Sequence, residues 1–239
     1  MRRFSQFRSH LRANLAWTFV PPRVEVTSQL TRFGSGYGGY YVDTSRLSSN
    51  SIVYSLGVGE DVSFDLALID WCGVEVHAFD PTPRVRTWLE TQSLRPSFHF
   101  HGLGIADFDG YTEFYLPRNH EHVSLSLLRA RQQSRDAVRL PVARLGTAMR
   151  QLRHARIDLL KMDIEGAEYG VLEEIVHNAI PVGQILVEFH HRFRSLGVSK
   201  TRSMLARLSK FGMEVAHVCP RCEVFTLVGV NHQCIEDRR

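Results

Sequence analysis

From residue 51 onward, the apolar residues follow two kinds of spacing along the chain. Short apolar runs, which are typical of strands buried on both faces, predict strands at residues 51–56, 74–79, 97–103, 157–162 and 184–189. Segments with helical spacing of apolar residues predict helices at residues 63–72, 83–92, 146–152, 167–178 and 199–211. Regular alternation of strand and helix indicates a doubly wound α/β domain built on a parallel sheet.

The end of the chain departs from this alternation. Residues 215–218 and 224–230 read as two strands joined by a short turn, and they predict an antiparallel pair. A dinucleotide-binding fold would continue with a second parallel half, whereas a Rossmann-like methyltransferase sheet ends in such a hairpin. The order of elements therefore favours methyl transfer, with seven strands in the sheet.

Two other regions interrupt the pattern. Within residues 110–140 we expect one extra strand at 111–116, and the polar remainder reads as a long loop. We predict a domain at residues 51–239, preceded by an N-terminal extension at residues 1–50. Glycine and aromatic residues alternate at 32–41, a composition that suits a lid over a ligand and equally an ordinary glycine-rich connection.

Composition and charge restrict the choice of partners. The 239 residues are 44% hydrophobic and carry 29 Lys and Arg against 25 Asp and Glu, a net charge of +4. The arginines are scattered and no aromatic stacking module accompanies them, so we expect no nucleic-acid partner. No apolar run approaches the ~20 residues of a membrane-spanning helix. We therefore expect a cytoplasmic protein without a transmembrane segment.

Four cysteines are too few and too unevenly placed for a disulfide framework in a chain of this size. Cys219 and Cys222 form a CxxC pair, but it lies between two predicted strands and lacks a second pair of ligands at zinc-site spacing. We expect a hairpin turn there.

A glycine loop follows the first predicted strand. Gly57 and Gly59 would let the backbone pass close to a ligand, and the next helix offers free N–H groups. Asp80 closes the second strand, about 20 residues later, where a carboxylate can bind ribose hydroxyls or simply cap a helix. Val62 stands where an NAD-binding loop needs its third glycine, and Ser55 stands where a methyl-donor loop usually has an acid.

Charged side chains follow the fourth strand. Alternation along the strand places Lys161, Asp163 and Glu165 on one side, next to the glycine loop. Ionisable groups are costly to bury at a strand end, so three that converge indicate a functional site, although a lysine paired with carboxylates can be purely structural.

After the fifth strand, Glu188, His190 and His191 stand together. A histidine beside carboxylates is a candidate general base, and packed histidines are equally common. His190 is favoured over His191 because it shares the strand face of Glu188, which could orient it.

Four of these segments, residues 53–61, 79–83, 157–168 and 185–188, resemble the FkbM family of S-adenosylmethionine-dependent methyltransferases. The most specific is Lys-Met-Asp-Ile-Glu-Gly-Ala-Glu at 161–168, and the resemblance extends from about residue 51 to about residue 191. It implies a Rossmann-like class I methyltransferase fold, S-adenosylmethionine as cofactor, and O-methylation of a hydroxyl on a sugar or secondary metabolite.

The usual family loop resembles Asp-x-Gly-Ala-Asn-x-Gly, and this chain departs from it at Ser55, Glu60 and Val62. The two glycines are retained. Because the usual acid is missing, Glu60 or Asp61 would supply the charge that holds the methionine amine.

In-line transfer of a methyl group requires an aligned hydroxyl and a proton acceptor. We expect Asp163 and Glu165 to line the transfer site, His190 or Asp163 to act as base, and Lys161 to steady the carboxylates. The residues expected to bind the cofactor are Gly57, Gly59, Glu60, Asp61, Asp80 and Asp163. A divalent metal on Asp163, Glu165 or Glu188 is an open alternative, because oxygen clusters suit magnesium.

Two rival functions remain. The altered loop would also fit a catalytically silent cofactor-binding protein. An NAD-dependent oxidoreductase is disfavoured by Val62 and by the terminal hairpin.

Overall fold

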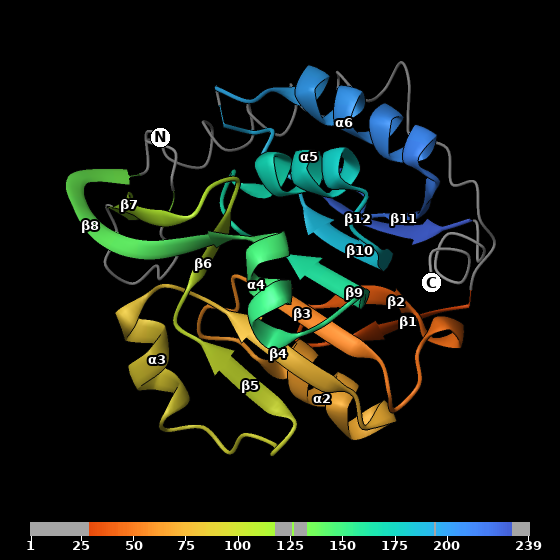
Figure 1. Ribbon diagram of the computed structural model, residues 1–239, viewed down its shortest axis with the longest axis horizontal. Helices are drawn as coiled ribbons and strands as arrows, with labels where there is room; N and C mark the ends of the chain where they lie inside the picture. The colour runs from red at the N-terminus through yellow and green to blue at the C-terminus, as the bar shows by residue number, and fades with distance from the viewer. Residues whose placement is uncertain (1–28, 118–125, 127–132, 194, 231–239) are drawn as a thin grey trace.

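The computed structural model describes residues 29–117, 126, 133–193 and 195–230, and all that follows concerns them. A seven-stranded sheet in the order β11-β12-β10-β9-β3-β4-β5 forms the centre (Figure 1). Its strands are β3 (Ile52–Leu56), β4 (Glu75–Phe79), β5 (Phe98–His101), β9 (Ile157–Met162), β10 (Val182–Glu188), β11 (Met213–Val218) and β12 (Val224–Gly229). Neighbouring strands from β5 to β10 are parallel, and β12 runs antiparallel to both β10 and β11. The predicted sheet and its terminal hairpin are confirmed.

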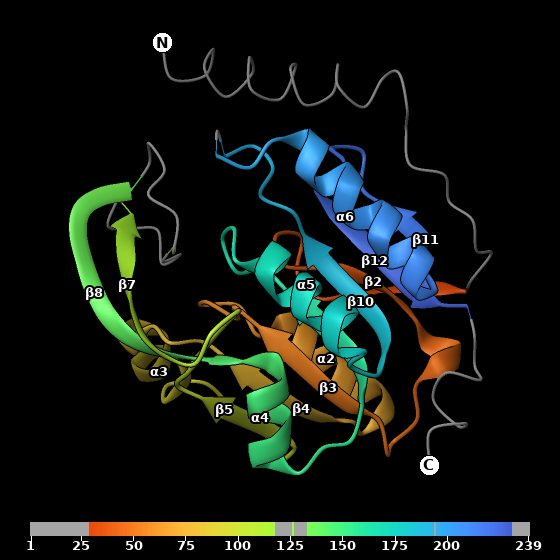
Figure 2. The same cartoon turned by 45° about the horizontal axis from the view of Figure 1, so that its top comes forward.

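Five α-helices cover the two faces of this sheet in the described chain. They are α2 (Ser63–Cys72), α3 (Pro83–Leu89), α4 (Leu145–Leu152), α5 (Glu168–Asn178) and α6 (Val198–Phe211). Buried side chains of α4, α5 and α6 share one hydrophobic cluster, and those of α2 and α3 share a second on the opposite face (Figures 1 and 2). The apolar runs read as buried strands are therefore buried on both sides, as a parallel sheet requires.

A smaller three-stranded sheet stands beside the main one. It consists of β6 (Gly104–Ala106), β7 (Gly110–Pro117) and β8 (Gln133–Arg144) in the order β6-β8-β7. Figure 1 shows β8 curving away from the central sheet. The sequence predicts only β7. The prediction of a loop for residues 133–136 is wrong, because these four polar residues, Gln-Ser-Arg-Asp, begin strand β8, which pairs with its neighbours through the backbone.

A hairpin precedes the central sheet. Its strands β1 (Leu30–Phe33) and β2 (Tyr40–Asp43) pair antiparallel, and a short 3-10 helix, η1 (Thr44–Arg46), follows. Phe33, Tyr40 and Val42 are buried in the same cluster as α2. The side-chain amide of Gln184 accepts from the Asp43 N–H at 3.1 Å and donates to the Asp43 carbonyl at 3.0 Å. This part of the expected extension thus packs into the core of the domain.

The CxxC pair lies in the turn between β11 and β12. The Cys222 N–H donates to the Cys219 carbonyl at 2.8 Å, and both thiols are free. The predicted hairpin turn is confirmed. No helix in the described ranges is both long and apolar enough to cross a membrane.

Candidate active site

The glycine loop is locked against the end of β9. The Gly57 N–H donates to the Phe79 carbonyl at 2.8 Å, and the Asp163 N–H donates to the Leu56 carbonyl at 3.0 Å. Gly57 has φ +72°, and a Cβ there would lie 1.9 Å from the Asp163 carbonyl oxygen. Only glycine fits, so the first glycine of the motif serves the contact between the β3 and β9 loops.

Gly59 occupies a different environment. Its φ is +55°, and a Cβ built there would meet nothing within 4 Å. The backbone at Gly59 therefore borders open space at the carboxyl edge of the sheet, where a bound molecule can approach it closely.

Lys161 supports the backbone of the glycine loop through a hydrogen bond. Its ammonium donates to the Gly57 carbonyl at 2.8 Å, lies 5.6 Å from the centre of the Tyr40 ring, and belongs to a residue only 6% exposed. The predicted convergence of Lys161 with the glycine loop is therefore present, with the lysine supporting the backbone.

Asp80 connects two loops. One carboxylate oxygen accepts from the Gly59 N–H at 3.1 Å, and the other accepts from the Thr82 N–H at 2.9 Å, ahead of α3. The residue is buried. Asp80 thus supports the backbone of the glycine loop and of the Thr82 turn that precedes α3. Its predicted contact with ribose hydroxyls stays a prediction.

Glu60 and Asp61 already have partners within the chain. Glu60 forms a two-pronged ion pair with Arg84, at 2.7 and 3.1 Å. Asp61 accepts from the Ser35 hydroxyl at 2.6 Å and from the Ser63 N–H at 2.9 Å, which joins the hairpin loop to the start of α2. Burial alone would raise the pKa of Asp61, but the hydrogen bonds from Ser35 and Ser63 outweigh it and lower that pKa.

An unpredicted acid, Asp65, stands beneath the loop. It lies in the first turn of α2, is 1% exposed, and is near enough to Lys161 for the two charges to interact. Burial raises the pKa of Asp65 to about 6, and the Lys161 charge opposes that rise. The buried carboxylate near the glycine loop therefore comes from helix α2. Ser55 occupies the strand position at which the family usually has an acid. The sequence does carry one indication of this: Asp65 is spaced so that it lies on the same buried face of the helix as Leu68 and Ile69.

The carboxylates gather around His190 at the ends of β9 and β10. Ligand-type atoms of Asp163, Glu165 and His190 all lie within 4.8 Å of one another. His190 Nε2 lies 3.6 Å from Asp163 Oδ1 and 3.4 Å from Glu165 Oε2, and it has no hydrogen-bond partner among the described residues. The structure therefore brings together three of the four residues predicted to be catalytic.

Glu168 fixes the other side of the His190 ring. One of its oxygens accepts from the His190 backbone N–H at 2.7 Å and lies 3.3 Å from His190 Nδ1. The other accepts from the Gly166 N–H at 2.8 Å. Both Glu168 and His190 are fully buried. The sequence does not single out Glu168, because its contact with His190 depends on a turn that periodicity does not describe.

The charge of the cluster follows from these contacts. Burial favours neutral His190, but the hydrogen bond and charge of Glu168, with Glu165 and Asp163, raise the pKa of His190 to about 9. At neutral pH the ring is an imidazolium. Desolvation raises the pKa of Asp163, against the lowering effect of His190 and Lys161. The pKa of Glu188 is also raised, by desolvation and then by Asp163.

The turn that carries Glu165 has a strained backbone. Glu165 has φ +49°, and its carbonyl accepts from the buried Ser126 hydroxyl at 2.8 Å. A non-glycine residue in the left-handed region costs roughly 1–3 kcal/mol, and such strain is concentrated at functional sites. Glu165 therefore reaches the cluster through this turn, beyond the end of β9.

His191 faces away from the cluster. It is buried, with Nδ1 3.3 Å from the Thr201 hydroxyl, which itself lies 2.7 Å from the Tyr169 hydroxyl. His191 thus belongs to the packing between α5 and α6.

Comparison with known proteins shows the family of this chain. Residues 52–215 match the family model described as the methyltransferase FkbM domain. The chain belongs to the FkbM methyltransferase family. Probable methyltransferase-like protein 24 of Homo sapiens is 29% identical to this FkbM domain over 158 residues, and its Rattus norvegicus counterpart is 30% identical over 158 residues. Each match covers 65% of this chain and 37% of the relative, so the FkbM chain spans little more than a third of these relatives' length.

Among solved structures, fibrillarin of Aeropyrum pernix, in complex with S-adenosylmethionine, is 13% identical to this chain with a TM-score of 0.43. The similarity covers 88% of this chain and 85% of fibrillarin.

Proposed function

We propose that this FkbM methyltransferase transfers the methyl group of S-adenosylmethionine to a hydroxyl of a small molecule, such as a sugar or secondary metabolite. The observation that carries the proposal is the cluster of two partly exposed carboxylates, Asp163 and Glu165, around the buried His190 beside the glycine loop. In open α/β sheets a ligand lies beyond the carboxyl ends of the strands, and this cluster stands at that edge.

The residues at the sheet edge fit the cofactor. Gly59 borders open space, and Asp80 stabilises the adjacent backbone and can face the ribose. The carboxylates of Asp163 and Glu165 stand together beside the glycine loop, where they can attract a sulfonium cation. When bound, S-adenosylmethionine supplies an electrophilic methyl group; the chain has to bind it, orient the acceptor and remove a proton.

We assign proton acceptance to Asp163. His190 holds a proton at neutral pH and is fully buried, whereas the Asp163 side chain is 35% exposed. A carboxylate with a raised pKa is a stronger base than an ordinary one, which favours removal of the proton as the acceptor oxygen attacks. His190 then acts as a fixed positive charge that positions Asp163 and Glu165.

A divalent cation is the competing occupant of the same cluster. Two carboxylates and one imidazole suit a transition metal, but the metal would have to displace the His190 proton, so its affinity would rise with pH. Activity that survives chelation and shows no metal requirement would support a cluster that holds a protonated His190 and no metal.

We also assign the β1–β2 loop as a lid. Tyr37 at its tip is 93% exposed, and the Ser35 hydroxyl in the same loop donates to Asp61 at 2.6 Å. The β1–β2 loop therefore lies beside the glycine loop. Tyr37→Ala should raise KM for the acceptor and leave the free energy of unfolding nearly unchanged.

The test has two stages. Calorimetric titration with S-adenosylhomocysteine and with NAD comes first: binding of NAD alone, or of neither, refutes the proposal. Transfer of labelled methyl groups to a panel of hydroxylated acceptors follows, with Asp163→Asn and, as a control, exposed Asp70→Asn on α2. We expect Asp163→Asn still to bind S-adenosylhomocysteine, which lacks the sulfonium charge, and to lose about 100-fold or more in transfer rate, as for removal of a general base. Cofactor binding without transfer to any acceptor would favour the catalytically silent alternative, and equal rates in both variants would refute the role of Asp163 as proton acceptor.

A further inference from the structure

A second group of titratable side chains lies away from the cofactor edge. Glu75 and His77 stand on β4, His99 and His101 on β5, and His154 follows α4. Glu75 is the first residue of β4, whereas the active site begins after its last residue. None of these five residues takes part in the proposed methyl transfer.

The sheet register brings the group together. His77 pairs with Tyr54 of β3 on one side and with His99 of β5 on the other, so the rings share one face of the sheet. The His77 ring centre lies 4.9 Å from that of His99, 5.4 Å from that of His101 and 4.7 Å from that of His154.

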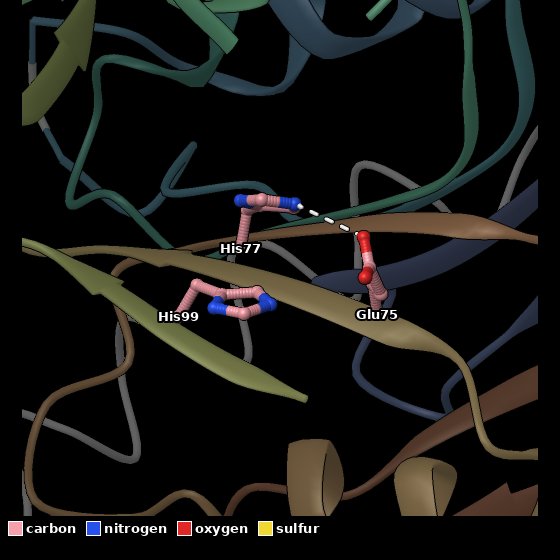
Figure 3. A group of neighbouring side chains, drawn as sticks. All are labelled: Glu75, His77 and His99. Atoms are coloured by element: carbon pink, nitrogen blue, oxygen red, sulfur yellow. Dashed lines mark ion pairs between the residues drawn. The ribbon is translucent and has the colours of Figure 1, made fainter. Parts of the chain in front are cut away.

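Three of the side chains converge on one point. One ligand atom each from Glu75, His77 and His99 lies within 4.8 Å of the other two. Figure 3 shows a His77 ring nitrogen directed at the Glu75 carboxylate, with His99 alongside from the neighbouring strand; the nitrogen and the carboxylate oxygen are 4.0 Å apart. That distance is too long for a hydrogen bond. Two ligands of a tetrahedral zinc ion stand about 3.4 Å apart, so a small side-chain rotation would close the gap.

The hydrogen bonding of His77 leaves one nitrogen free. Its Nδ1 lies 3.1 Å from His101 Nε2, and one of these two nitrogens must carry the proton between them. His77 Nε2, by contrast, is buried without a hydrogen-bond partner among the described residues, in a residue only 7% exposed. When Nδ1 donates to His101, Nε2 presents a lone pair toward Glu75. A metal-binding histidine is commonly held in this way by a second acceptor on its far nitrogen.

The surroundings keep the His77 ring neutral. Burial lowers its pKa to about 3, and the neighbouring histidines His154, His101 and His99 add to that lowering. The pKa values of His101 and His154 are lowered as well, chiefly by burial. A neutral imidazole is the form that binds a metal. The site rests on the position of His77 Nε2, which has no hydrogen-bond partner among the described residues and lies 4.0 Å from the Glu75 carboxylate.

We propose that Glu75, His77 and His99 form a structural site for a transition metal ion, with Zn²⁺ as the matching ion, that joins strand β5 to β4. Two imidazoles and a carboxylate are ligands that zinc accepts, and His154 or a water molecule would supply the fourth. β5 is a four-residue strand at the edge of the sheet, paired only with β4 in the main sheet, so a metal across the pair would anchor the edge. Glu75 is exposed, which gives the ion a route of entry.

The test is titration of the full chain, without an affinity tag and freed of metal, with Zn²⁺ at pH 7. We expect one strong site by calorimetry and a higher midpoint of thermal unfolding in the presence of Zn²⁺, because the ion binds the folded state. His99→Ala and Glu75→Gln should each weaken binding by at least about 10-fold. The matched control is His177→Ala, an exposed histidine at the end of α5, which should bind zinc like the unaltered chain.

Two further variants separate this site from its competitors. Asp163→Asn removes a ligand of the active-site cluster, and Cys219→Ser with Cys222→Ser removes the CxxC pair; both should keep the strong zinc site. The proposal is overturned if the unaltered chain binds no zinc, if His99→Ala and Glu75→Gln bind it unchanged, or if either competitor variant abolishes binding.

Discussion

The charge of His190 makes the stability of the fold depend on pH. The folded-state pKa is about 9, against 6.5 for an unperturbed histidine. At about 1.4 kcal/mol per pKa unit, this difference corresponds to roughly 3 kcal/mol of folding free energy. Because the pKa is raised on folding, the contribution is complete below pH 6.5 and is lost as the pH rises through about 9.

Urea denaturation followed by tryptophan fluorescence, at a series of pH values from 6 to about 10, measures this effect. Other groups titrate in the same range, so the quantity of interest is the difference between the unaltered chain and His190→Gln. The unaltered chain should lose about 3 kcal/mol more than the variant across this range.

Histidine-labelled nuclear magnetic resonance gives an independent measurement on the unaltered chain, should His190→Gln fail to fold with its carboxylates unpaired. One imidazole should titrate near pH 9, and Glu168→Gln should lower that value because it removes the largest stabilising partner of the ring. Equal pH profiles for the two chains, together with no histidine titrating above about pH 7.5, would refute the charged His190.

Four other substitutions test the loop. Gly57→Ala should destabilise the fold by more than about 3 kcal/mol because its Cβ would collide with the Asp163 carbonyl, whereas Gly59→Ala should cost only about 1 kcal/mol and chiefly weaken S-adenosylhomocysteine binding; thermal unfolding and calorimetry separate the two. Lys161→Met should lower both stability and cofactor affinity because it removes the hydrogen bond to the Gly57 carbonyl, and unchanged affinity would contradict its supporting role. Asp61→Asn should weaken cofactor binding if this acid holds the methionine amine; unchanged binding would leave it only the role of joining the hairpin to α2.

The sequence predicts the central sheet because burial leaves a direct trace in composition. β9 and β10 are covered on both faces, so most of their positions are apolar and their approximate extent follows. β8 and the β1–β2 hairpin leave no such trace. β8 begins with four polar residues and belongs to a three-stranded sheet with a small core of its own, and the hairpin encloses a glycine-rich loop that reads as a connection.

The active-site residues divide in a similar way. The convergence of Lys161 and Asp163 beside the glycine loop follows from strand topology alone, and sequence reasoning reaches it. Asp65 and Glu168 are missed because they come from helices, where periodicity predicts a face but not a partner across the domain. The contacts of Glu165 depend on a positive φ, which no pattern of apolar residues encodes.

The two histidine clusters show how neighbours decide the chemistry of one residue type. His190 is surrounded by carboxylates, and its pKa rises to about 9; His77 is surrounded by other imidazoles, and its pKa falls to about 3. Near pH 7 the first ring therefore carries a charge and the second carries a free lone pair. We expect zinc at the β4–β5 site, where His77 Nε2 has no hydrogen-bond partner among the described residues and lies 4.0 Å from the Glu75 carboxylate. The carboxylates around His190, beside the glycine loop, suit a cationic methyl donor instead.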